Sequence, residues 1–286
     1  MMEYKEKCGG PWPGHVVFLI DQSGSMSIQC GSMTRLELAQ NCITKSINDI
    51  ILGCVSGEDF SNRCYISVIG YGKKGDSVEL IRHGWASEWE DDVMSCKYNG
   101  KPLFTLECTD GWTPMAGAFN MAKELLEAWH EKIKREIANP KASDPTKREK
   151  PIIAMGLPIV INITDGCKED FEQVPGYLEE VMNSAVNLMN TYDNDGGKVF
   201  LFNAHMGDGQ EIKFPIEKSL LAGNYQTEFL FDISSELTSR MAQSAAHIFV
   251  SDNGAKIGAG CKGLVANAQE ATLTRFIEFG SNISNP

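Results

Sequence analysis

Five oxygen-bearing side chains stand beside predicted strand ends or a predicted helix start in this 286-residue sequence. Asp21, Ser23 and Ser25 come directly after an apolar run. Thr113 precedes a proline that opens a long amphipathic stretch, and Asp165 follows a second apolar run. Because open parallel sheets bind ligands beyond the carboxyl ends of their strands, we expect these five side chains to converge on one small site.

The two carboxylates and three hydroxyls form an oxygen-only ligand set. Mg²⁺ takes near-octahedral oxygen coordination at about 2.1 Å, whereas zinc favours nitrogen or sulfur. The nine cysteines are scattered and include no C-x-x-C pair, so a thiolate zinc site is not expected. The residue types therefore predict Mg²⁺ or Mn²⁺.

The elements that must position these residues follow from hydrophobic periodicity. Short apolar runs alternate with amphipathic stretches, which is typical of a parallel sheet covered by helices on both faces. We predict an α/β fold with a doubly wound, mostly parallel, Rossmann-like sheet. Strands are expected at residues 15–20, 64–71, 77–82, 157–164, 198–204 and 247–250, with 77–82 antiparallel to 64–71.

Helix starts are marked by capping signals. Thr34 and Glu37 match a capping box, and the helix that they open is expected to end near Gly53. Thr113 is expected to be the N-cap of a second helix, with Pro114 at its first position, where the missing N–H costs nothing. A closing helix is predicted over residues 268–279. With no linker-like segment, residues 1–286 are expected to form a single domain, with a core over about 14–250 and a strand and helix extension over 251–286.

The D-x-S-x-S run, the downstream threonine and the later T-D-G resemble the metal-ion-dependent adhesion site (MIDAS) of von Willebrand factor A (VWA) domains. Asp21, Ser23 and Ser25 match the first loop of that site, Thr113 the second and Asp165 the third. The resemblance covers roughly residues 14–250 and implies the VWA fold. It also implies that the hydroxyls touch the metal directly and the aspartates touch it directly or through water.

The resemblance implies a binding protein and not an enzyme. Neutral hydroxyl ligands leave the dication poorly neutralised, so its open position should attract an Asp or Glu of a protein partner. Trp112, beside Thr113, is a candidate anchor for that partner. The chain looks most like the standalone bacterial cytoplasmic members, including proteins similar to the TerY group of tellurite-resistance clusters, which implies a signalling or stress-response complex with a Ser/Thr kinase or phosphatase.

Two alternatives stay open. Asp21 follows a strand as a phosphoryl-accepting aspartate would, which suggests a metal-dependent hydrolase or phosphatase, although Ser23 stands where such enzymes commonly place a second aspartate. A structural subunit with an empty, vestigial site is the other. The G-x-G-x-x-G match at 70–75 precedes a strand-like alternation, so we interpret it as a hairpin and not as a dinucleotide loop.

The charge composition limits the classes of partner that this chain is expected to bind. The 38 acidic residues exceed the 26 basic ones, for a net charge of −12, which disfavours nucleic acid and anionic membrane surfaces. No apolar run reaches the roughly 18 residues of a spanning helix, and the first residues lack the pattern of a secretory signal. A cytoplasmic location is therefore expected.

Overall fold

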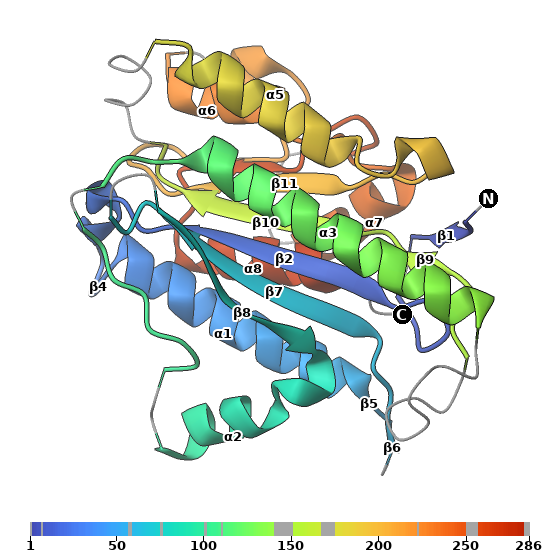
Figure 1. Ribbon diagram of the computed structural model, residues 1–286. Helices are drawn as coiled ribbons and strands as arrows, with labels where there is room; N and C mark the ends of the chain where they lie inside the picture. Colours follow the sequence, from blue (N-terminus) through green and yellow to red (C-terminus); the bar gives the residue numbers. More distant parts are fainter. Residues whose placement is uncertain are drawn as a thin grey trace.

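The computed structural model describes residues 2–6, 8–56, 59–74, 77–99, 102–109, 111–139, 151–166, 175–221, 223–249 and 257–282. Within them, a seven-stranded sheet runs through the centre of the molecule in the order β12-β13-β11-β10-β2-β7-β8 (Figure 1). Its strands are β2 (Gly14–Asp21), β7 (Cys64–Tyr71), β8 (Val78–Trp85), β10 (Ile159–Thr164), β11 (Phe200–His205), β12 (Ile212–Lys213) and β13 (Leu264–Ala266). Only the edge strands β8 and β12 are antiparallel to their neighbours, so the predicted doubly wound, mostly parallel sheet is confirmed.

Helices cover both faces of the sheet because its central strands are apolar on both sides. In β2, Val16, Phe18 and Ile20 pack into one core, and Val17 and Leu19 pack into the other. The first core lies under α1 (Arg35–Cys54), α7 (Ser239–Ile248) and α8 (Glu270–Asn282), and the second under α3 (Met115–Ala138), α5 (Tyr177–Met189) and α6 (Tyr225–Asp232) (Figure 1). The helix α2 (Glu90–Asn99) follows β8 and packs beside α1.

Short elements complete the described fold. They are the strand pairs β1 (Tyr4–Lys5) with β9 (Met155–Gly156), β3 (Gln29–Cys30) with β4 (Met33–Thr34) and β5 (Val55–Ser56) with β6 (Asp59–Phe60), and the 3-10 turns η1 (Gly24–Ser27), η2 (Ala86–Glu88), η4 (Asp193–Asp195) and η5 (Lys218–Leu221). None of the helices in these described ranges combines the length and the hydrophobicity that a bilayer crossing requires.

One predicted strand is wrong. Residues 247–248 belong to α7, and Val250 lies outside the described residues. The short apolar run there resembles a strand, but Met241 and Ala245 are buried at helical spacing one turn earlier, so the same helical face continues. The strand that enters the sheet is β13, between β11 and β12, so the segment expected as an extension contributes to the core.

The hairpin interpretation of the glycine motif is confirmed. β7 and β8 form an antiparallel ladder in which Tyr71 pairs with Val78. Gly75 of the motif lies outside the described residues. Because a strand and not a helix follows this turn, no helix N-terminus is present there to bind a dinucleotide phosphate.

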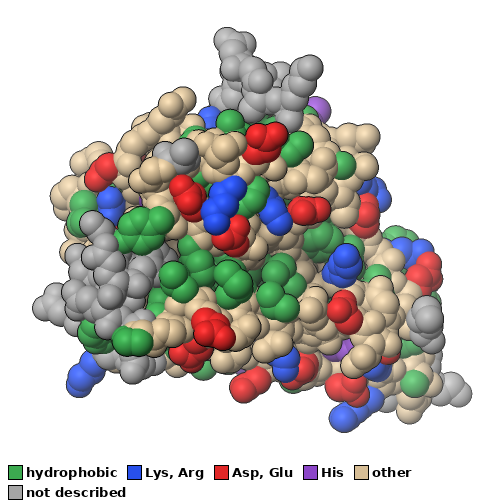
Figure 2. Space-filling model, turned by 90° about the horizontal axis from the view of Figure 1, so that it is seen from above, with side chains coloured by type: hydrophobic (Ala, Val, Ile, Leu, Met, Phe, Trp, Pro, Cys, Tyr) green, Lys and Arg blue, Asp and Glu red, His purple; other side chains and the backbone are tan. Residues whose placement is uncertain are grey.

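Hydrophobic side chains also gather on the outer face of the molecule that carries α5 and α6. Figure 2, which looks down on this face, shows them near its middle with charged side chains around them. On α5, Leu178, Met182 and Val186 are exposed at intervals of four residues, while Val181 and Leu188 on the same helix are buried. α5 therefore presents a short apolar stripe outward.

Candidate metal centre

The sheet register brings the first and third predicted loops together. β2 and β10 are parallel neighbours in which Ile20 pairs with Ile163, so Asp21 and Thr164 end their strands side by side. The Thr164 hydroxyl donates to Asp21 Oδ2 at 2.6 Å. Across the same edge, Ser25 Oγ donates to Asp165 Oδ1 at 2.8 Å. Two loops separated by 140 residues thus share one hydrogen-bonded cluster.

The first loop folds back on the end of its own strand. The Ser23 backbone N–H donates to Asp21 Oδ1 at 2.8 Å, and η1 then turns the chain so that the hydroxyls of Ser23 and Ser25 lie 3.3 Å apart. Asp21 and Ser23 are buried, and Ser25 is half-buried. The D-x-S-x-S spacing therefore places one carboxylate and two hydroxyls together, as predicted.

The second loop reaches the site beside Gly72, which follows β7. A side chain at Gly72 would begin 2.6 Å from the Trp112 carbonyl oxygen and 3.3 Å from the Ser23 backbone nitrogen, and the φ of Gly72 is +82°. Only glycine suits both that close approach and that backbone conformation. The chain on either side of Thr113 consequently lies against the first loop, and Thr113 itself is buried.

The start of the second helix differs by one residue from the prediction. α3 begins at Met115, and Pro114 occupies the N-cap position, so Thr113 precedes the cap and does not serve as it. The Thr113 carbonyl accepts a hydrogen bond of 2.6 Å from the Tyr177 hydroxyl on α5. The backbone of the second loop is therefore fixed from the α5 side.

Burial and mutual repulsion act on the two aspartates. Removal from water and, to a smaller extent, the nearby Asp165 carboxylate together raise the pKa of Asp21 to about 7, against the lowering effect of the Thr164 and Ser23 hydrogen bonds. The pKa of Asp165 is also raised by burial, while Ser25 and Arg35 oppose that shift. Two buried carboxyl groups that disfavour each other's charge form a site that a cation would stabilise.

The residues present fit a hard dication. The Ser25 hydroxyl donates to Asp165. Ser23 connects this pair to Asp21, since its hydroxyl contacts Ser25 and its backbone N–H donates to Asp21. The Thr113 loop lies against Ser23. In the described part of the chain, no group of three or more His, Cys, Asp or Glu side chains is arranged to hold a metal. A metal here would depend on serine and threonine hydroxyls, which suit Mg²⁺ or Mn²⁺ better than zinc.

Sequence reasoning missed two residues that contact the predicted ligands. Thr164 holds Asp21, and its hydroxyl also accepts from the Gly166 backbone N–H at 2.9 Å. Arg35, the first residue of α1, donates from Nη1 to Asp165 Oδ2 at 2.8 Å, with side-chain exposures of 10% and 3%. A signal for Arg35 was available: a cation in the first turn of a helix opposes the helix dipole and calls for a nearby carboxylate.

No protein-family model and no curated protein matches this chain. Solved structures with a similar fold include the vWF domain of the type V pili tip protein Mfa5 from Porphyromonas gingivalis, at 10% identity and a TM-score of 0.42 over 78% of this chain and 87% of that one. Proximal thread matrix protein 1 from the mussel byssus is 12% identical, with a TM-score of 0.45 over 97% of this chain and 49% of that one. A form of that protein with a zinc-occupied MIDAS motif gives 12% identity and a TM-score of 0.43 over 97% and 48%.

This chain spans about half the length of the mussel protein and 20% of a three-domain Mfa5 structure. At these identities and TM-scores the likenesses carry no conclusion about a ligand or a partner. The candidate metal centre rests instead on the contacts of Asp21 with Thr164 and of Ser25 with Asp165.

Proposed function

We propose that this chain is a metal-dependent binding module whose five predicted residues hold Mg²⁺ or Mn²⁺. The observation that carries the proposal is the convergence of three separate loops. The Thr164–Asp21 and Ser25–Asp165 hydrogen bonds join the first and third loops, and the second loop lies against the first at Gly72. The ligands would be Asp21, Ser23, Ser25, Thr113 and Asp165.

The chain's own residues prepare the site before any metal arrives. Thr164 and the Ser23 backbone fix both oxygens of Asp21, while Ser25 and Arg35 fix both oxygens of Asp165. This preorganisation lowers the entropy cost of assembling the ligands. A bound dication would supply an electrophilic position for an anionic oxygen from another molecule.

The partner that fits this chemistry is a protein that offers an Asp or Glu carboxylate. Trp112 stands directly before Thr113, and its side chain is 44% exposed, so its ring is accessible to a partner seated over the site. The intracellular bacterial signalling context, with a Ser/Thr kinase or phosphatase as the partner, belongs to this proposal through the sequence resemblance alone.

The geometry gives no support to the hydrolase alternative. A phosphoryl-accepting aspartate needs a free carboxylate oxygen that can reach the phosphorus atom. Asp21 is fully buried, and a phosphate ester is much larger than a bare cation, so it cannot reach this carboxylate without displacing the first loop. We therefore favour binding over catalysis.

The proposal is tested by titrating Mn²⁺ into EDTA-treated protein and recording the melting temperature and the heat of binding. A metal at one hundred times its Kd should stabilise the wild-type chain by about 2.7 kcal/mol through mass action. Asp21→Ala and Ser25→Ala should lose most of that stabilisation. Asp193→Ala, which removes an exposed aspartate in η4, is the matched control and should retain it. An unchanged melting temperature in the wild type, or equal shifts in all four proteins, would contradict the proposal.

A further inference from the structure

Arg35 occupies an unusual position for a cation. It is the first residue of α1, directly after the N-cap Thr34, whose capping box with Glu37 fixes the helix start. Its backbone N–H donates to the Ile28 carbonyl at 3.0 Å. A positive charge in the first turn of a helix is unfavourable, and this side chain is also nine-tenths buried. The ion pair with Asp165 compensates for both costs.

The same ion pair changes the charge of the candidate metal centre. With Asp21 and Asp165 ionised, a dication would bring the centre to neutrality. Arg35, in contact with Asp165, leaves the loaded centre with one positive charge. A buried net charge is costly unless an opposite charge approaches it closely, so the loaded centre should favour an anion.

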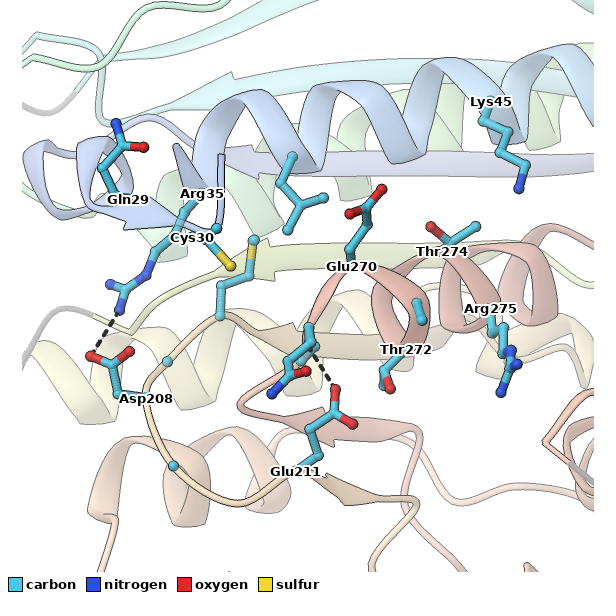
Figure 3. Close-up of a pocket in the computed structure, with 18 of the residues that line it drawn as sticks. Gln29, Cys30, Arg35, Lys45, Asp208, Glu211, Glu270, Thr272, Thr274 and Arg275 are labelled. Carbon is cyan, nitrogen blue, oxygen red and sulfur yellow. Dashed lines mark hydrogen bonds and ion pairs between the residues drawn. The ribbon is translucent and has the colours of Figure 1, made fainter. Parts of the chain in front are cut away.

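Arg35 also faces the direction from which an anion can arrive. Its Nη2 lies 3.6 Å from Asp208 Oδ2, beyond ordinary hydrogen-bond distance, and the Asp208 side chain is 99% exposed. Both residues line a cavity of about 900 Å³ between α1 and α8. Figure 3 shows Arg35 and Asp208 pointing toward each other at one end of this cavity. A carboxylate that enters the cavity can replace Asp208 as the acceptor for Nη2.

We infer that Arg35 sets the ligand preference of the metal centre: it weakens the binding of the metal alone and makes full occupancy depend on a carboxylate ligand. The inference rests on the proposed function and deepens it. Since linkage is reciprocal, the factor by which a carboxylate tightens metal binding equals the factor by which the metal tightens carboxylate binding. Arg35 thereby couples the metal to the partner and prevents a loaded site from persisting without one.

The test measures Mn²⁺ affinity by electron paramagnetic resonance, with acetate as the carboxylate probe and chloride at equal ionic strength as the reference. In the wild-type chain acetate should tighten Mn²⁺ binding. Arg35→Gln removes the positive charge, and it should raise the affinity for Mn²⁺ in chloride by about tenfold, because like charges at close range repel strongly even at a high effective dielectric constant. In the same variant the acetate effect should become smaller, because only the attraction between the metal and the carboxylate remains.

Arg35→Lys is the matched control, because it keeps the charge and loses only the planar fork. It should keep the wild-type Mn²⁺ affinity in chloride to within about threefold, since the dominant charge is unchanged. The acetate response of the wild-type chain tests the same charge balance without any substitution, should Arg35→Gln not fold.

The outcomes separate this inference from the proposed function. Mn²⁺ binding that depends on Asp21 but is equal in the wild type and Arg35→Gln, with equal acetate effects in both, overturns the role of Arg35 and leaves the metal centre intact. Absence of Mn²⁺ binding in both proteins overturns the metal centre and this inference together. Binding in Arg35→Gln alone supports the repulsion by Arg35 and rejects the proposed function of the native chain.

Discussion

Replacement of Asp21 by Asn should make the metal-free protein more stable while it abolishes metal binding. Asp21 is fully buried, and its pKa is raised from 3.8 to about 7 by burial and by Asp165. The folded-state pKa therefore lies above the unfolded one. Stability from this group is fully present below pH 3.8 and is lost as the pH rises through 7, because ionisation is easier in the unfolded chain.

The magnitude follows from that pKa difference. Just over three pH units at 1.36 kcal/mol each amount to about 4 kcal/mol of folding free energy lost by the metal-free wild type at pH 8. Asparagine avoids this loss but weakens the hydrogen bonds that Asp21 accepts from Thr164 and Ser23, at about 1 kcal/mol each. Asp21→Asn should then be more stable by about 2 kcal/mol at pH 8, with almost no difference at pH 5, where the ionisation and hydrogen-bond effects are of similar size.

Urea unfolding in EDTA at several pH values measures this difference directly. The same experiment with saturating Mn²⁺ should reverse the order, because only the wild type gains from the metal. Asp193→Asn changes an exposed aspartate and should leave the pH dependence unchanged. A metal-free Asp21→Asn protein that is less stable than the wild type at pH 8 would refute the view that this carboxylate is held at a cost to folding.

Three further predictions concern the frame around the site. Burial lowers the pKa of His15 to about 3, below its unfolded value, so folding stability is lost as the pH falls below 6.5. In urea unfolding at pH 4.5, His15→Gln should avoid a loss of about 3 kcal/mol. His247→Gln, which changes an exposed residue, is the control and should not avoid that loss. Gly72→Ala should destabilise the fold by about 1–3 kcal/mol through its positive φ and the clash with the Trp112 carbonyl. Calorimetry should also detect weaker Mn²⁺ binding in this variant. An unchanged Mn²⁺ affinity would mean that this contact does not position the second loop. Thr34→Ala removes the capping box of α1 and should lower the stability measured by thermal unfolding by about 1 kcal/mol. Thr34→Ser keeps the capping hydroxyl and should be close to the wild type. An equal loss of stability in both variants would argue against the cap.

Local signals predicted most of the framework. The capping box at Thr34 fixed the start of α1 because it is formed by residues three apart in sequence. The apolar runs predicted β2, β7 and β10 because a strand that is buried on both faces is a nearly continuous apolar run in the sequence. The same reasoning failed at residues 247–248, where Ile248 and the following Phe249, at the end of α7, resemble the start of a strand. A run this short does not distinguish helix from strand by periodicity.

The sequence by itself determined the chemistry of the candidate site: the oxygen types, their three loops and the edge of the sheet where Asp21 and Asp165 lie. That information is local, because each loop is adjacent in sequence to the strand or helix that positions it. Only the tertiary structure decided what contacts those oxygens, since Arg35 and Asp165 are 130 residues apart and Thr164 and Asp21 are 143 apart. Such pairs depend on strand register and helix packing, which no spacing in the chain encodes, and they set the charge that a metal and its partner would meet.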